Sequence, residues 1–458
     1  MNLNSILYPL QFIILSILFL YSNGIKAGEC SGNCENGQGT MIYGPNEKYT
    51  GDWSGGQKHG RGIYYFPNGD KYDGEFKNGT FSGNGVFSFV EGSVYTGQFK
   101  DNMFHGQGTL QFQDYSYYKG DFQNGKRNGR GLYRYPDGSE YEGEFKDDRF
   151  HGKGKYVYAE KDYYIGEFKN DKYSGKGTLY YKNGDVYEGD FRDGLKEGYG
   201  AYTYSTKAKF VGEFIKDKYQ GKGVYYFADG DKYDGEFKDD KFHGEGVYYF
   251  SNGSKYSGKF IEDKYQGKGT FTSSSGNKYI GEFKDDKYHG KGQLTYANGD
   301  NYNGDFREGI YYGKATLIYA NGDKYVGEFA NGKRNGKGSY FYLNGDKYTG
   351  DFSEDKYHGK GVYKFADGSN YEGDFSEDRY QGYGVYTYPS GEKYMGYFFD
   401  DMRNGKGTYF LSDGSKYEGE YKNNKKEGTG VLYDKNGAVI YSGLWINGEP
   451  AVVSTTGK

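Results

Sequence analysis

The sequence predicts an all-β protein, built as an elongated single-layer array of antiparallel β-hairpins, and three observations support this fold class. Glycine supplies 80 of the 458 residues and tyrosine 58, and aromatic residues make up 20% of the chain within a hydrophobic total of only 34%. A residue pattern recurs every 23 positions, and turn signals recur at the same spacing. This composition excludes ordinary aliphatic cores, and the abundance of rings excludes a disordered chain.

The repeating unit is defined by two motifs. The pattern Tyr-x-Gly-[Asp/Glu]-Phe begins at Tyr49 and returns every 23 residues to Tyr417, which gives 17 copies, with Phe210 in place of one tyrosine and a further copy at Tyr441. A Gly-x-Gly motif keeps the same period and fails once, at Ala315. Self-similarity at a fixed period is typical of repeat proteins in which each unit packs only against its neighbours.

Each repeat is expected to form one hairpin. Side chains alternate along a strand, so the aromatic residues and glycines share one face; both glycines of Gly83-Asn84-Gly85 are expected on that face. Signals such as Asn68-Gly69 predict a two-residue hairpin turn. The other connection, such as residues 238–241, is expected to be longer and charged.

The two faces of the predicted sheet differ in chemistry. Four aromatic columns run along one face, including those of Tyr49, Trp53 and Tyr64, and the bare glycines let rings lie over the backbone. On the opposite face the position of Asp52 is acidic in 14 of 17 copies and that of Arg61 is Lys or Arg in 11 of 17. Acid–base pairs on neighbouring strands would keep an open sheet soluble.

These residues resemble the MORN (membrane occupation and recognition nexus) repeats, whose consensus is close to Tyr-x-Gly-x-Trp-x-x-Gly-x-x-x-Gly-x-Gly. The resemblance covers about residues 37–445, with 17 to 18 copies, and the consensus Trp is mostly Phe here, with Trp kept at Trp53 and Trp445. It implies an elongated array of hairpins that serves in binding and scaffolding.

The segments outside the array carry separate expectations. Residues 1–27 are interpreted as a signal peptide, which implies the secretory route or bacterial export; the alternative is a membrane anchor formed by residues 6–21, because the first residues carry no Lys or Arg. Residues 28–36 form a cap in which Cys30 and Cys34 are expected to form a disulfide, with metal binding or redox activity as the alternative. Residues 446–458 form a C-terminal tail.

The sequence predicts no enzyme, no metal site and no cofactor. Its six histidines occupy one repeat position, interpreted as a polar site at a turn end: His59, His105, His151, His243, His289 and His358. Acid pairs in the charged connection could serve as calcium ligands or as the catalytic carboxylates of a glycosidase. They are interpreted as solvated, and they are Asp147-Asp148, Asp239-Asp240, Asp285-Asp286 and Asp400-Asp401. The formal net charge of −4 also gives no reason to expect nucleic acid as a partner.

We therefore expect a scaffold or adaptor that acts through protein contacts. Tyr383 replaces the base of the ladder, Tyr397 replaces its acid on the next strand, and Phe399 lies two residues further on. These outward rings predict an interface, with a homodimer as one outcome. Two alternatives are attachment to anionic lipid and a surface groove that takes glycans or peptides. Asn78 and Asn252 lie in sequons for glycosylation.

Overall fold

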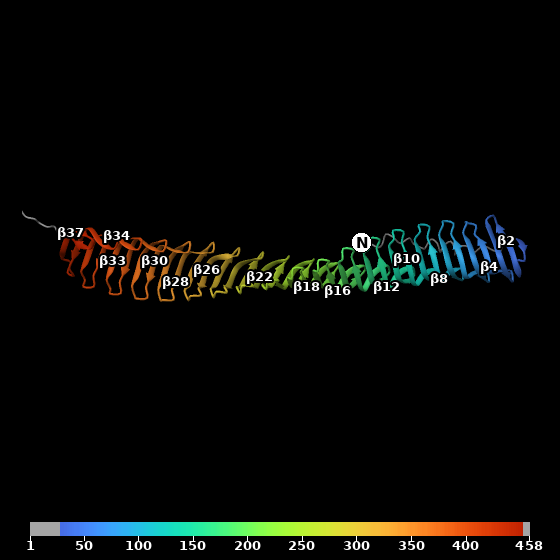
Figure 1. The fold of residues 1–458 in the computed structure, drawn as a ribbon, viewed down its shortest axis with the longest axis horizontal. Helices are drawn as coiled ribbons and strands as arrows, with labels where there is room; N and C mark the ends of the chain where they lie inside the picture. The colour runs from blue at the N-terminus through green and yellow to red at the C-terminus, as the bar shows by residue number, and fades with distance from the viewer. Residues whose placement is uncertain (1–27, 452–458) are drawn as a thin grey trace, which may run out of the picture. The chain divides into compact units, whose positions relative to one another are not determined.

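The computed structural model describes residues 28–451, which form 38 β-strands and, within that range, no helix (Figure 1). The chain divides into two compact units, residues 28–230 with 236–240 and residues 231–235 with 241–451. The predicted signal peptide, the alternative anchor at residues 6–21 and residues 452–458 of the tail lie outside the described residues.

The strands of residues 28–230 are β1 (Glu29–Gly32), β2 (Gly37–Gly44), β3 (Glu47–Ser54), β4 (Gln57–Tyr65), β5 (Lys71–Lys77), β6 (Thr80–Ser88), β7 (Val94–Lys100), β8 (Met103–Gln111), β9 (Tyr117–Gln123), β10 (Lys126–Arg134), β11 (Glu140–Lys146), β12 (Arg149–Val157), β13 (Tyr163–Lys169), β14 (Lys172–Tyr180), β15 (Val186–Arg192), β16 (Leu195–Thr203), β17 (Lys209–Ile215) and β18 (Lys218–Tyr226). The next strand, β19 (Lys232–Lys238), has residues in both units.

The strands of residues 241–451 are β20 (Lys241–Tyr249), β21 (Lys255–Ile261), β22 (Lys264–Thr272), β23 (Lys278–Lys284), β24 (Lys287–Thr295), β25 (Asn301–Arg307), β26 (Ile310–Ile318), β27 (Lys324–Ala330), β28 (Lys333–Phe341), β29 (Lys347–Ser353), β30 (Lys356–Lys364), β31 (Asn370–Ser376), β32 (Arg379–Thr387), β33 (Lys393–Phe399), β34 (Met402–Phe410), β35 (Lys416–Lys422), β36 (Lys425–Tyr433), β37 (Val439–Ile446) and β38 (Glu449–Pro450).

Within each unit the strands form a single antiparallel layer. A repeat contributes a seven-residue strand such as β11 and a nine-residue strand such as β12, and each strand pairs with the ones before and after it along the chain. The prediction of an all-β, single-layer array of hairpins is confirmed.

The two connections of each repeat are the reverse of the prediction. Asp147 and Asp148 alone join β11 to β12, with φ of 46° and 67°, both in the left-handed region that a type I′ turn requires and that Asp tolerates. The Asn-Gly connection is five residues long: the Phe66 amide donates to the Asp70 carbonyl at 2.9 Å, and only Gly69 has positive φ, at 94°. The predicted two-residue turn at Asn68-Gly69 is therefore wrong, because a type I′ turn needs two successive residues with positive φ and Asn68 does not have one.

A β-bulge also changes which way one glycine faces. The register of β5 and β6 shifts between Gly74 and Glu75, and Gly83 takes φ of 59° opposite this shift. A Cβ on Gly83 would meet the Glu75 carboxylate on the outer face, whereas a Cβ on Gly85 would lie 2.6 Å from the Tyr72 ring. The prediction that both glycines face the rings is therefore wrong for the first one, since the bulge interrupts the alternation.

The inner face is a continuous layer of rings, and Tyr141 shows its geometry. Its side chain is fully buried, it stacks on Phe150 at 3.8 Å between centroids, and it meets Phe145 edge-on at 5.1 Å. Its hydroxyl donates to the Glu144 carbonyl at 2.8 Å, at the bulge. Ring packing of this kind contributes about 0.5–1.5 kcal/mol per pair beyond the buried area, so the repeat replaces an aliphatic core with an aromatic one.

The inner face has a fifth column, which contains Phe150 and which the sequence patterns above leave out. In most repeats this position carries a ring that stacks on the first aromatic residue of the first motif, and in the others it carries a cation, which is buried at Arg127 and half-buried elsewhere. The rings are Phe81, Phe104, Phe150, Tyr173, Tyr219, Phe242, Tyr265, Tyr288, Tyr311, Tyr357 and Tyr380, and the cations are Lys58, Arg127, Lys196, Arg334, Arg403 and Lys426. A count of residue types at this position would have found it.

Candidate interaction surfaces

The outer face of both units carries the acid–base ladder that the sequence predicts. Lys176 lies opposite Asp190 in the register and pairs with it at 2.6 Å, and Lys291 pairs with Asp305 at 3.0 Å. The lysines are largely exposed, with 74% and 85% of their side-chain surface open to solvent. Pairs of this exposure contribute at most about 1 kcal/mol, so the ladder favours solubility more than stability.

The carboxylate of the ladder has a second role that the sequence did not reveal. The bulge leaves a backbone amide of the next strand without a strand partner, and the carboxylate accepts its hydrogen bond. The Arg130 amide donates to Asp121 at 2.8 Å, and the Asn84 amide donates to Glu75 at 3.0 Å. Because a buried or half-buried amide needs a partner, this requirement accounts for the near-constant acid at the position.

The histidines lie inside strands at the bulge, and the interpretation of a turn-end site is therefore wrong. His151 pairs in the register with Glu144, and His289 pairs with Glu282. The Nδ1 atoms of four histidines are buried without a hydrogen-bond partner in this structure: His59, His105, His151 and His289. Within residues 28–451, no three His, Cys, Asp or Glu side chains are arranged to hold a metal ion.

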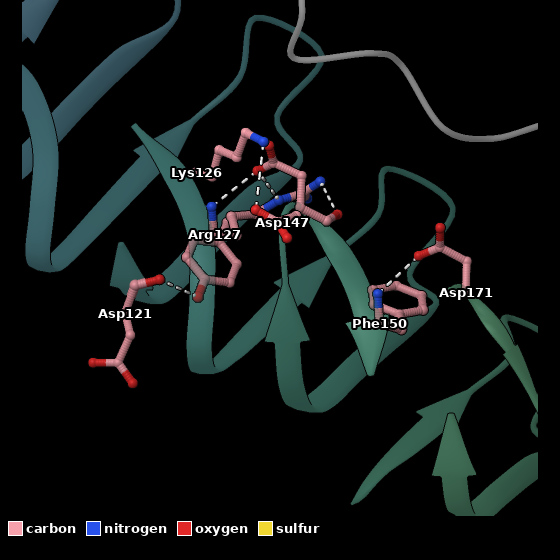
Figure 2. A network of polar contacts seen from close by, with 8 residues as sticks. Asp121, Lys126, Arg127, Asp147, Phe150 and Asp171 are labelled. Carbon is pink, nitrogen blue, oxygen red and sulfur yellow. Dashed lines mark hydrogen bonds and ion pairs between the residues drawn. The ribbon is translucent and has the colours of Figure 1, made fainter. Parts of the chain in front are cut away.

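The second acid of the charged turn bonds to the preceding hairpin (Figure 2). The Asp171 carboxylate accepts the Phe150 amide at 2.8 Å, and the Asp148 carboxylate accepts the Arg127 amide at 2.9 Å. Asp147, the first acid, reaches only the exposed Lys126, at 3.4 Å. The interpretation of these pairs as merely solvated therefore holds for the first acid and fails for the second, which joins adjacent repeats. Burial raises the pKa of Asp171 above its usual value.

The cations of the fifth column lie among rings. The Lys58 ammonium is 3.7 Å from the centroid of Tyr64 and 5.1 Å from that of Tyr43. The Arg127 guanidinium lies 5.1 Å from the Tyr133 ring and 5.6 Å from the Phe145 ring. Burial lowers the pKa of Lys58 to about 8, and the ring faces offset part of the lost hydration by cation–π attraction.

The N-terminal cap contains the predicted cysteine pair. The sulfur atoms of Cys30 and Cys34 lie within bonding distance of one another as a disulfide, with 6.3 Å between the Cα atoms. Cys30 lies on β1, which pairs with β2 at the start of the array. This strand covers the edge that β2 would otherwise leave open.

The predicted aromatic interface is brought together by two strands. Tyr383 on β32 and Tyr397 on β33 lie directly opposite each other, and their ring centroids are 5.6 Å apart. Phe399 follows on the same outer face. The exposed fractions of these three residues are 46%, 52% and 54%, respectively. We call this cluster the aromatic patch; it occupies the place that an acid–base pair takes in neighbouring repeats.

The two sequons lie in turns. Asn78 is exposed in the turn between β5 and β6 with φ of 48°, and the Thr80 hydroxyl donates to the Lys77 carbonyl at 2.8 Å. Asn252 is exposed between β20 and β21, and its side-chain oxygen accepts the Ser254 amide at 2.8 Å. Both asparagines are therefore open to solvent in the folded chain.

Each unit has a groove on its outer face that is floored by glycine backbone. In the N-terminal unit a groove of about 860 Å³ runs over Gly120, Gly131, Gly143, Gly154 and Gly166. In the C-terminal unit a groove of about 830 Å³ runs over Gly304, Gly327, Gly338 and Gly350. Both are bordered on one side by the ladder.

Between residues 28 and 451 the structure has no helix that is long and apolar enough to cross a membrane.

None of the curated proteins matches this chain. The SAS-4 (dCPAP) TCP domain of Drosophila melanogaster, in complex with a proline-rich motif of Ana2 (dSTIL), is 16% identical with a TM-score of 0.21, over 39% of this chain and 85% of that chain. The TCP10 domain of Danio rerio CPAP with a STIL peptide is 12% identical with a TM-score of 0.16, over 62% and 99%. Virginiamycin B lyase from Staphylococcus aureus is 10% identical with a TM-score of 0.11, over 58% and 93%. TM-scores this low carry no argument about this chain.

The repeat motifs themselves decide the family. The family described as MORN repeat matches 17 consecutive segments, from residues 49–71 to residues 417–439, each beginning at the first residue of the first motif, which is Tyr in 16 segments and Phe210 in the other. These segments cover most of the chain and coincide with the hairpins described above. The protein therefore belongs to the MORN repeat family.

Proposed function

We propose that this protein is a non-enzymatic scaffold that binds other proteins through the outer face of its hairpins and associates with a second copy through the aromatic patch. The observation that carries the proposal is the exchange of a ladder pair for Tyr383, Tyr397 and Phe399. A charged pair on a solvated face loses its hydration when a partner covers it, whereas three half-exposed rings bury apolar area when a partner covers them. Aromatic residues are enriched at the centres of protein interfaces.

The neighbouring repeats supply the comparison. Lys337 pairs with Asp351 at 2.5 Å and Lys360 pairs with Asp374 at 2.5 Å, on the same face and at the same positions of their repeats as Tyr383 and Tyr397. Two copies that met through the ladder would have to desolvate charges. Two copies that met through the aromatic patch would bury rings.

Sedimentation velocity tests self-association. The variant Tyr383→Lys with Tyr397→Glu restores the ladder, and the new carboxylate supplies the bulge acceptor that Tyr397 replaces. We expect the natural chain to show a concentration-dependent larger species and this variant to remain monomeric, with unchanged circular dichroism. The matched control, Lys337→Arg with Asp351→Glu, should behave as the natural chain. Equal masses for the natural chain and the ladder variant at all concentrations would contradict the proposal.

We also propose that the chain is exported by way of residues 1–27, as the apolar run at residues 6–21 suggests. Expression with a C-terminal tag, followed by sequencing of the mature N-terminus, tests this. Cleavage near Ala27 would support export of a soluble product. An intact N-terminus in a membrane fraction would favour the anchor instead, and an intact N-terminus in the soluble fraction would contradict both.

A further inference from the structure

The outer face of five repeats in the C-terminal unit carries a strong positive charge. We define the basic strip as three rows of outer-face side chains that run across β21 to β30, between Lys255 and Lys364. The edge row begins at Lys255, the middle row at Ser257, and the third row is the ladder. Together these rows hold eleven lysines and four carboxylates, a net charge of +7. The lysines are Lys255, Lys278, Lys324, Lys347 and Lys364 of the edge row and Lys259, Lys268, Lys291, Lys314, Lys337 and Lys360 of the ladder.

The corresponding rows of the N-terminal unit have no such charge. The five repeats from Val94 to Thr203 place six bases and seven acids at the same positions, a net charge of −1. Their middle row alternates in sign, as in Lys119, Glu142 and Lys155, whereas the middle row of the basic strip is uncharged. The basic strip is therefore a local departure and not a property of the repeat.

The edge-row lysines lack acidic partners among the residues that the structure describes. None of the five makes an ion pair, and Lys324 and Lys347 instead lie 5.0 Å and 4.9 Å from the centroid of the Phe341 ring. The nearest acids in sequence, Asp323 and Asp346, accept hydrogen bonds from the inner-face tyrosines Tyr340 and Tyr363 at 2.9 Å and 3.0 Å. Their carboxylates are thus occupied on the other side of the sheet.

Apolar side chains lie between these lysines. Ile280, Ile318 and Val326 are 47%, 44% and 40% exposed, and Val326 borders the groove of about 830 Å³. Solvent-exposed aliphatic residues on a face with this charge have no role in the aromatic core, which lies on the opposite side. Lysine and aliphatic residues interleaved across the strands, beside a groove lined by Lys291, Lys314 and Lys337, fit a ligand that presents both carboxylates and apolar groups.

We propose that the basic strip binds an extended acidic segment of a partner protein, laid across the strands over the edge row and beside the groove. This inference rests on the scaffold function proposed above and names the chemistry of one partner. Equivalent lysines on successive repeats are about 9.6 Å apart, from two strands at about 4.8 Å each. An extended chain in the polyproline II conformation advances about 3.1 Å per residue with three residues per turn, so carboxylates at every third residue point to the same side and meet such lysines in turn, with other residues between.

Binding of synthetic peptides to the full chain tests the register. The probe is a peptide of about fifteen residues, which spans about 48 Å when extended, with the unit Val-Ser-Glu repeated. The control peptide has the same composition with its glutamates in one block. We expect the repeating peptide to bind at least tenfold more tightly in a titration followed by fluorescence anisotropy. Equal affinity for the two peptides, or no binding of either, would overturn the proposal.

Two variants locate the site. Lys278→Gln, Lys324→Gln and Lys347→Gln together should weaken binding about tenfold and reduce its salt dependence. The charge-matched control, Lys119→Gln, Lys153→Gln and Lys155→Gln in the N-terminal unit, should change affinity less than twofold. Equal losses in both variants would show non-specific attraction and refute the site.

Vesicles that contain phosphatidylserine and a single-stranded oligothymidine are tested alongside the peptides. Tighter binding of either one, with the same dependence on Lys278, Lys324 and Lys347, would assign the basic strip to a membrane or to nucleic acid and refute the peptide proposal. Sedimentation of the same variants should be unchanged, since the aromatic patch lies outside the basic strip. Failure of one proposal is therefore distinguishable from failure of the other.

Discussion

The inner and outer faces of the hairpins differ in how much they vary along the chain. On the inner face the column that contains Tyr141 is Tyr or Phe in every matched repeat, and these side chains are fully buried. On the outer face, the three rows carry a net charge of −1 over the five repeats from Val94 to Thr203 and of +7 over the five repeats of the basic strip. The backbone and its hydrogen bonds are the same in both cases. One face thus maintains the fold, and the other is free to differ in what it binds.

The largest expected effect breaks the inner face by pH. Burial raises the pKa of the inner tyrosines Tyr225 and Tyr417 to about 12, while the tyrosines of the unfolded chain ionise near 10. Their contribution to stability is therefore full below pH 10 and is lost as the pH rises above it. We expect the melting temperature to fall steeply between pH 10 and pH 12, with the last part of the rise in phenolate absorbance coinciding with loss of the β signal.

The control for this prediction is chain position. Phe210 replaces the tyrosine of the first motif in its repeat, so Tyr187→Phe and Tyr233→Phe give three consecutive repeats in which this column cannot ionise. Hydrogen exchange in β15 to β18 should then persist to higher pH than in β11 to β14. Strands that stay protected after the phenolate absorbance has reached its plateau would contradict the assignment.

The second effect tests the bare backbone under the rings. Gly154→Val should destabilise its hairpin by about 3 kcal/mol, because a Cβ there would lie 2.6 Å from the Tyr141 ring. Hydrogen exchange of β11 and β12 measures the loss. Lys153→Val, the neighbouring residue on the outer face, should cost less than about 0.5 kcal/mol. Similar losses at the two positions would remove the distinction between the faces.

The third effect separates the two acids of the charged turn. Asp171→Ala removes the acceptor of the Phe150 amide and should cost about 1–3 kcal/mol. Asp147→Ala removes only an exposed ion pair and should cost about 0–1 kcal/mol. Denaturant titration followed by hydrogen exchange at β12 and β14 compares them. An equal cost would mean that the bond between hairpins is not stabilising.

The smallest effect sharpens the description of the outer face itself. Glu144→Ala leaves the Lys153 amide, which donates to Glu144 at 3.2 Å, without its acceptor, and should cost about 1 kcal/mol. Lys153→Ala should cost only a few tenths of that amount. Thermal melting of both variants measures the difference. If the lysine variant proved the less stable of the two, charge pairing and not the bulge amide would explain the ladder.

The sequence predicts the hairpins well because a 23-residue period with alternating rings allows few other arrangements. It fails where the backbone leaves ideal strand geometry. Asn68-Gly69 is a good turn signal, yet the left-handed pair that makes the two-residue turn is Asp147-Asp148, since Asp tolerates that conformation. The bulge then reverses Gly83, which strict alternation cannot anticipate.

The binding surfaces are partly visible in the sequence. Tyr383 and Tyr397 break the ladder, and their cross-strand register follows from the period alone. The basic strip is not visible in residue counts, because counts over all repeats average its charge away. The absence of an ion pair at Lys324 and Lys347 also depends on the side to which Asp323 and Asp346 point. Which carboxylate faces which side of a sheet is a matter of three-dimensional structure.

The bond between the Asp171 carboxylate and the Phe150 amide joins residues 21 positions apart, and the other links between hairpins span similar distances. These hydrogen bonds between hairpins thus join neighbouring repeats. A gene could lengthen or shorten this protein by whole repeats, through unequal recombination, without disturbing the remaining ones. Each duplicated unit would arrive with its rings in place and its outer side chains free to diverge.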